Sequence, residues 1–198
     1  MARIGELMNK RVLFVAATLA VSAQSMAHIE MFAGTFSGLN ENPPNASPGT
    51  GSSLVTLDLD MFTMRVQCDF SGLIGTTTAS HIHVATSSTA NGAVATQTPS
   101  FIGFPLGVTS GSMDMTYDMA LASSYNSSFI TANGGTVSTA FTALYNALSQ
   151  GRAYHNIHTS FAGGGEIRAN LVPVPEPGTY AALGLGVVAL FGRRRKNA

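Results

Sequence analysis

Alternation of hydrophobic and polar positions in the middle of the chain predicts a series of short β-strands. This period of two runs through residues 31–36, 54–59, 64–70, 78–84 and 113–119, and residues 60–63 can turn the chain between the second and third segments. Because successive side chains of a strand point to opposite faces, each segment can bury one side and leave the other polar.

The period changes once, near residue 140. Phe141, Leu144, Tyr145 and Leu148 recur at helical spacing, with Ser138 as an N-cap and Gly151 just past the end. Residues 121–130 fit neither period. Many short strands with one short helix predict an all-β fold, an antiparallel β-sandwich or small barrel.

The last two segments of this domain, 152–159 and 166–172, read as a hairpin closed by a glycine-rich loop. A register in which paired residue numbers sum to 324 separates the polar from the apolar side chains. The polar face then holds Tyr154, Asn156, His158, Glu166, Arg168 and Asn170, and the apolar face Ile157, Ile167, Ala169 and Leu171. His155 points inward with the apolar set.

The N-terminus has the pattern of a secretory signal peptide. Basic residues Arg3, Lys10 and Arg11 precede the apolar run 12–21, and Ser25-Met26-Ala27 supplies small residues at a cleavage position. We therefore predict a signal peptide over residues 1–27, with cleavage after Ala23 as the alternative. The domain proper spans residues 28–173.

The C-terminus carries three features in a fixed order. Pro175-Glu176-Pro177 is followed by the uncharged stretch 180–192 and then by Arg193-Arg194-Arg195-Lys196. This order in residues 174–198 resembles the PEP-CTERM sorting signal of Gram-negative bacteria. The resemblance implies export, transient anchoring in the inner membrane, cleavage by an exosortase and a final place on the cell surface or in the extracellular matrix.

The length of the apolar stretch agrees with a removable membrane segment. Residues 178–192 are fewer than the roughly 20 that a spanning helix needs. The cations after it would remain cytoplasmic, which leaves the domain outside. An ordinary C-terminal tail anchor is the alternative.

Composition excludes some partners. Between residues 28 and 173 eight acidic and three basic side chains leave a formal charge of −5, with histidine counted as neutral. Nucleic acids and anionic membrane surfaces need basic patches, so neither is an expected partner. Cys68 is the only cysteine, so the exported domain contains no intrachain disulfide.

Four short segments resemble the CHRD domain, a module first named from chordin. They are residues 41–44 (Glu-Asn-Pro-Pro), 81–83 (His-Ile-His), 154–159 (Tyr-His-Asn-Ile-His-Thr) and 165–168 (Gly-Glu-Ile-Arg). The resemblance spans about residues 33–171. The chain departs from the family at Ala169-Asn170, commonly Gly-Gln, and at His155, usually an aliphatic residue.

The resemblance implies a fold and an exported location more than a mechanism. Because no pair of nucleophile and base can be named in the sequence, we expect a module that is not an enzyme. We expect a binding or structural role at the cell surface, with exopolysaccharide or surface proteins as partners and no cofactor.

The alternative is a metalloprotein, either a metal-binding module or a redox enzyme. His81 and His83 share one face of a strand with Cα atoms roughly 6.6 Å apart. With His158 and Glu166 on the outer face of the hairpin, they predict a Zn²⁺ or Cu²⁺ site. The competing interpretation is a structural polar cluster with Tyr154, Asn156 and Arg168. In it His158 donates to Glu166, Arg168 pairs with Glu166, and the other histidines bind backbone carbonyls.

Overall fold

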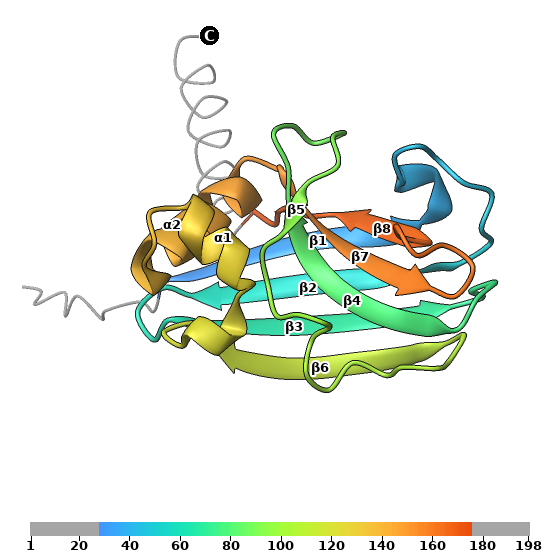
Figure 1. Ribbon diagram of the computed structural model, residues 1–198, viewed down its shortest axis with the longest axis horizontal. Coiled ribbons are helices and arrows are strands. Elements are labelled where there is room, and N and C mark those ends of the chain that lie inside the picture. The colour runs from blue at the N-terminus through green and yellow to red at the C-terminus, as the bar shows by residue number, and fades with distance from the viewer. Residues whose placement is uncertain (1–27, 176–198) are drawn as a thin grey trace, which may run out of the picture.

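The computed structural model describes residues 28–175, in which one antiparallel sheet curls into a half-barrel with helices packed at one end (Figure 1). The strand order is β5-β4-β7-β8-β1-β2-β3-β6, and β9 also pairs with β1. The strands are β1 (Ile29–Ser37), β2 (Thr50–Asp58), β3 (Thr63–Ser71), β4 (Thr77–Val84), β5 (Ala93–Val94), β6 (Gly111–Asp118), β7 (Ala153–Thr159), β8 (Ile167–Asn170) and β9 (Val172–Pro173). The predicted all-β class is confirmed, in the form of a curled sheet.

The predicted strands are present because their alternating side chains supply the core. Val55 and Leu57 of β2 and Met64 and Val66 of β3 are fully buried, while the residues between them reach the outer face. Burying such aliphatic side chains contributes roughly 1.5–3 kcal/mol each.

The free edge of β4 is covered by the segment that leads to β6. The amide of Ala95 donates to Ile82 O (2.9 Å), that of Phe101 to Ser80 O (3.0 Å) and that of Gly107 to Thr77 O (2.8 Å). Residues 95–107 therefore follow β4 beyond the short strand β5. These bonds satisfy an edge that would otherwise stay unpaired.

The predicted helix is α2 (Val137–Ser149), which buries one face made of Ala140, Phe141, Leu144, Ala147 and Leu148. Its N-cap is Thr136 and not Ser138, because Thr136 forms a capping box with Thr139. Gly151 follows the C-cap with φ +64°, as expected for a helix end. The ambiguous segment holds a 3₁₀ turn (Ala122–Ser124) and helix α1 (Ser127–Ala132).

The hairpin register is confirmed: Tyr154 pairs with Asn170, and Asn156 with Arg168. His155 points into the core with no exposed surface, as predicted. Within residues 28–175 no helix is long and apolar enough to cross a membrane. The predicted signal peptide (1–27) and most of the sorting signal, including Glu176, Pro177 and Arg193 to Arg195, lie outside the described residues.

Candidate functional site

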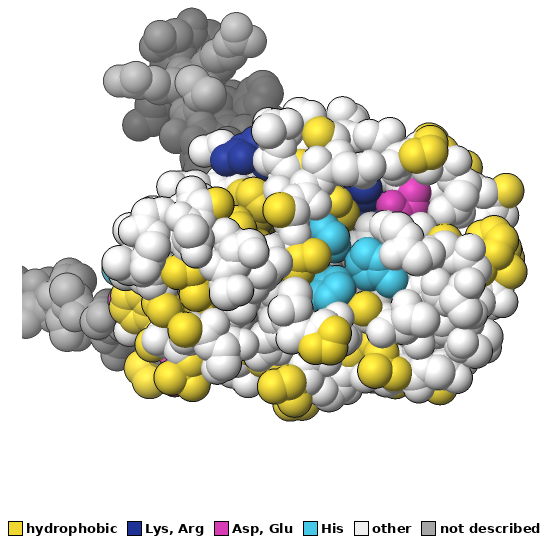
Figure 2. Space-filling model, viewed as in Figure 1, with side chains coloured by type: hydrophobic (Ala, Val, Ile, Leu, Met, Phe, Trp, Pro, Cys, Tyr) yellow, Lys and Arg dark blue, Asp and Glu magenta, His cyan; other side chains and the backbone are white. Residues whose placement is uncertain are grey.

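Three histidines from two neighbouring strands meet on the outer face of the sheet. His81 and His83 alternate with buried Ile82 on β4, and His158 lies near the end of β7. Their ring centroids are 5.1 to 5.6 Å apart, and His83 Nε2 lies 3.4 Å from His158 Nε2. One nitrogen from each ring lies within 4.8 Å of the other two. Figure 2 shows histidine side chains gathered on this side of the molecule.

Each of these rings also contacts a backbone carbonyl. His81 Nε2 donates to Pro99 O (2.7 Å), His83 Nδ1 to Gly92 O (3.0 Å) and His158 Nδ1 to Gly163 O (3.0 Å). Since a carbonyl oxygen only accepts, each contacting nitrogen carries the hydrogen. The second nitrogen of each neutral ring therefore bears a lone pair.

Burial keeps these rings neutral at physiological pH. His81 and His83 are almost completely buried beneath the loops that supply their carbonyl partners, and His158 is partly exposed. Desolvation lowers the pKa of all three, that of His83 to about 4. Nδ1 of His81 is buried without a hydrogen-bond partner.

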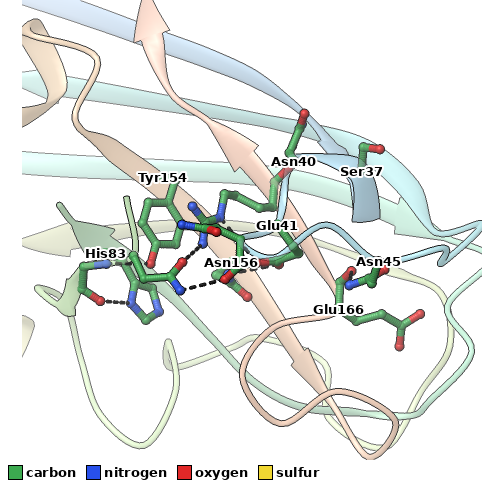
Figure 3. A network of polar contacts seen from close by, with 12 residues as sticks. Ser37, Asn40, Glu41, Asn45, His83, Tyr154, Asn156 and Glu166 are labelled. Atoms are coloured by element: carbon green, nitrogen blue, oxygen red, sulfur yellow. Dashed lines mark hydrogen bonds and ion pairs between the residues drawn. The ribbon is translucent and has the colours of Figure 1, made fainter. Parts of the chain in front are cut away.

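A second polar group adjoins the histidines. The Tyr154 ring stacks on His83, and the Arg168 guanidinium lies over Tyr154 with Cζ 3.7 Å from the ring centroid. Arg168 Nε lies 3.3 Å from Glu41 Oε2, and both side chains are buried. Asn156 Nδ2 donates to both oxygens of Glu41, at 3.1 and 3.2 Å (Figure 3).

Glu41 is the central acid of this group. Burial raises its pKa, and Arg168 and Asn156 oppose that shift without reversing it. The loop that carries Glu41 leaves the end of β1 through a 3₁₀ turn (Gly38–Asn40). Asn40 Nδ2 fastens this turn to Thr35 O and Arg168 O, at 3.0 Å each.

The structure corrects three expectations about Glu166. Arg168 pairs with Glu41, His158 donates to Gly163 O, and the Glu166 carboxylate is not part of the group formed by the three histidines. It accepts hydrogen bonds from Ser47 Oγ, Thr159 Oγ1 and the amides of Ile74 and Gly75, at 2.6 to 3.1 Å. Burial alone would raise its pKa, but these four bonds lower it. Glu166 therefore joins three loops.

Several members of this site were not singled out from the sequence. Glu41 was noted only as the first residue of the segment 41–44 that resembles the CHRD domain, although its charge in an otherwise uncharged loop was the available clue. The carbonyls of Gly92, Pro99 and Gly163 have no sequence signature, because every residue has a carbonyl. Asn91, which binds Arg168, lies between the predicted strands 78–84 and 113–119, where no element was predicted.

Two family models match the chain. The CHRD domain model covers residues 32–171, more than two thirds of the sequence, and a PEP-CTERM protein-sorting motif covers residues 173–196. The chain belongs to the CHRD domain family. Together the matches identify an exported surface protein that is sorted by exosortase-type machinery. Neither the curated proteins nor the solved structures contain a significant match.

Proposed function

We propose that the mature protein is a non-enzymatic module that acts on the cell surface or in the extracellular matrix by binding a matrix component. The observation that carries the proposal is the order of the two matched segments, a CHRD domain directly followed by a sorting motif. That order supports the export of the folded domain, since the sorting motif follows it in the chain.

The charge of the domain supports a partner that is neither nucleic acid nor an anionic membrane. Two of its three arginines are engaged within the domain, Arg168 with Glu41 and Arg65 with Asp114. A formal charge of −5 over residues 28–173 favours neutral or positively charged surface components. Exopolysaccharide and surface proteins are the proposed partners.

The reactive groups of the domain favour a non-enzymatic role. Burial raises the pKa of the Cys68 thiol to about 12, so it is unsuited to nucleophilic attack. His155, the histidine closest to serine hydroxyls, is buried in the core between Ser53 and Ser80. A substrate would have no access to either hydroxyl there.

Fractionation of a Gram-negative host with and without its exosortase gene tests the sorting step. We expect the chain in the surface or extracellular fraction of the parent strain, with a mass that shows cleavage near Pro175-Glu176-Pro177. The triple variant Pro175→Ala/Glu176→Ala/Pro177→Ala should remain in the membrane at higher mass. An uncleaved wild-type chain in the membrane of the parent strain would instead support a permanent tail anchor.

Cosedimentation with matrix from the same host tests the binding step. The processed protein should sediment with isolated matrix, and digestion of the matrix by glycosidases or by protease should show which component retains it. A protein that stays in the supernatant at physiological salt with both components intact would contradict the proposed role.

A further inference from the structure

We propose that His81, His83 and His158 form a binding site for one Zn²⁺ or Cu²⁺ ion. The proposal concerns a site within the domain and does not depend on where the domain is finally displayed. It rests on the spacing of the ring nitrogens, on the way each ring is held, and on one buried nitrogen without a partner.

The spacing matches a shared ion. Two nitrogens that are each 2.0–2.1 Å from a tetrahedral zinc ion are about 3.4 Å apart. His83 Nε2 and His158 Nε2 are separated by 3.4 Å. The ligand atom of His81 completes a triangle with sides no longer than 4.8 Å, so this ring needs to approach by at most about 1.4 Å to join the same ion.

The carbonyl contacts prepare the rings for coordination. Ligating histidines commonly donate their other N–H to a carbonyl or carboxylate, which fixes the tautomer and the ring orientation. Here Gly92, Pro99 and Gly163 supply the three carbonyls. These residues belong to three different loops. Each carbonyl accepts the hydrogen of one ring nitrogen, so the other nitrogen of that ring is free to bind.

Hydrogen bonding alone does not explain the cluster. With Nδ1 of both rings donating to carbonyls, a bond between His83 Nε2 and His158 Nε2 would require one ring to be protonated. In the neutral rings the two Nε2 lone pairs therefore lie 3.4 Å apart with no hydrogen between them. His81 Nδ1 is buried with no partner in the described structure. A cation held between His83 and His158 would satisfy both of their lone pairs, and His81 offers a third ring nitrogen within 4.8 Å.

The chemistry of the donors selects the class of ion. Imidazole nitrogens suit zinc and copper, whereas Ca²⁺ and Mg²⁺ take oxygen ligands. Three neutral rings leave the ion its full charge and a fourth position that water or an external group can fill. His158 is partly exposed, so solvent reaches the cluster at this ring.

The test is a metal titration of the full chain, purified in detergent without a polyhistidine tag and stripped with a chelator. We expect one Zn²⁺ or Cu²⁺ per chain by mass spectrometry and calorimetry, with a higher unfolding temperature in the bound form. The two ions are titrated separately and against each other. Electron paramagnetic resonance of the copper form should show coupling to three nitrogens. Neither ion binding above the level of a metal-free control protein would overturn the proposal.

Variants locate the ion. His83→Ala and His158→Ala should each weaken binding at least about 100-fold, since loss of a ligand costs more than loss of its outer partner. His155→Leu is the matched control, because it removes a buried histidine outside the cluster. Glu166→Gln should also bind normally. Retained binding in a His83→Ala/His158→Ala double variant would disprove the site.

Folding of the variants is measured separately by near-ultraviolet circular dichroism without metal. His158→Ala changes a partly exposed ring and decides the outcome if His83→Ala does not fold. A folded His158→Ala protein that binds the ion as tightly as wild type would contradict the proposal.

Discussion

His83 and Tyr154 stack face to face across the β4–β7 pair, with ring centroids 4.9 Å apart and planes 8° from parallel. Arg168 covers Tyr154, and Glu41 pairs with Arg168. The three-histidine cluster and the buried ion pair are therefore joined by direct contacts across three adjacent strands. Figure 3 shows His83, Tyr154 and Glu41 of this row. A substitution in the histidine cluster or in the ion pair should therefore also affect the side chains at the other end of this row.

Removal of Arg168 should be strongly destabilising. Arg168→Met leaves the buried Glu41 carboxylate without its cation, which costs about 3–5 kcal/mol in comparable buried pairs. The free energy of unfolding is measured by urea titration. In Glu41→Gln/Arg168→Met neither charge remains, so the double variant should be more stable than Arg168→Met alone. A loss equal to that of an exposed pair such as Arg65–Asp114 would contradict the burial argument.

The glycine at the end of the hairpin loop is required by both backbone and space. Gly165 has φ +131°, and a Cβ there would overlap the Asn156 amide and lie 2.7 Å from Glu41 Oε1. Gly165→Ala should therefore lower the free energy of unfolding by roughly 1–3 kcal/mol. Gly163→Ala, in the same loop but in open space, is the control and should change stability little. Equal effects of the two substitutions on stability would show that the loop can shift to accommodate a Cβ at residue 165.

Stability should fall in mild acid because of His155. Its ring is enclosed by Ser53 Oγ (2.8 Å) and Ser80 Oγ (2.7 Å), and burial lowers its pKa to about 3. The unfolded chain binds this proton near pH 6.5 and the folded chain does not, so the free energy of unfolding decreases as pH falls from 6.5 toward 3. The slope attributable to one proton is about 1.4 kcal/mol per pH unit.

His155→Leu should remove that proton from the titration. Its free energy of unfolding at neutral pH should drop by about 1–2 kcal/mol, because the two serine hydroxyls lose a partner. Between pH 4 and 6 its decline should be shallower than that of wild type. Denaturant titrations at several pH values measure both effects, and parallel curves for the two proteins would refute the assignment.

Glu166 should matter for stability and not for metal binding. Glu166→Gln replaces one of its acceptor oxygens by an amide donor and removes the charge from four hydrogen bonds, which we expect to cost about 2–3 kcal/mol. Glu30→Gln, a partly exposed acid on β1, is the control. Urea unfolding and metal content are measured on the same preparations. Loss of metal binding in a folded Glu166→Gln protein would show that this carboxylate is part of the metal site.

The sequence by itself determined the longer strands, the main helix and the register of the last hairpin. These features depend on local periodicity and on keeping Ile157, Ile167 and Ala169 on one buried face, so residues near in sequence suffice to predict them. It also placed His81, His83 and His158 on the outer face, for the same reason. The sequence alone carried both terminal motifs.

Tertiary structure alone decided which acid meets which base. Glu41 reaches Arg168 from a loop 127 positions away in the chain, while Glu166, only two positions away, turns to the amides of Ile74 and Gly75. Sequence spacing cannot show this, because the partner of a buried charge is set by the loop that folds over it. The carbonyls that orient the three histidines were likewise decided by loop conformation, since a backbone group is the same at every residue.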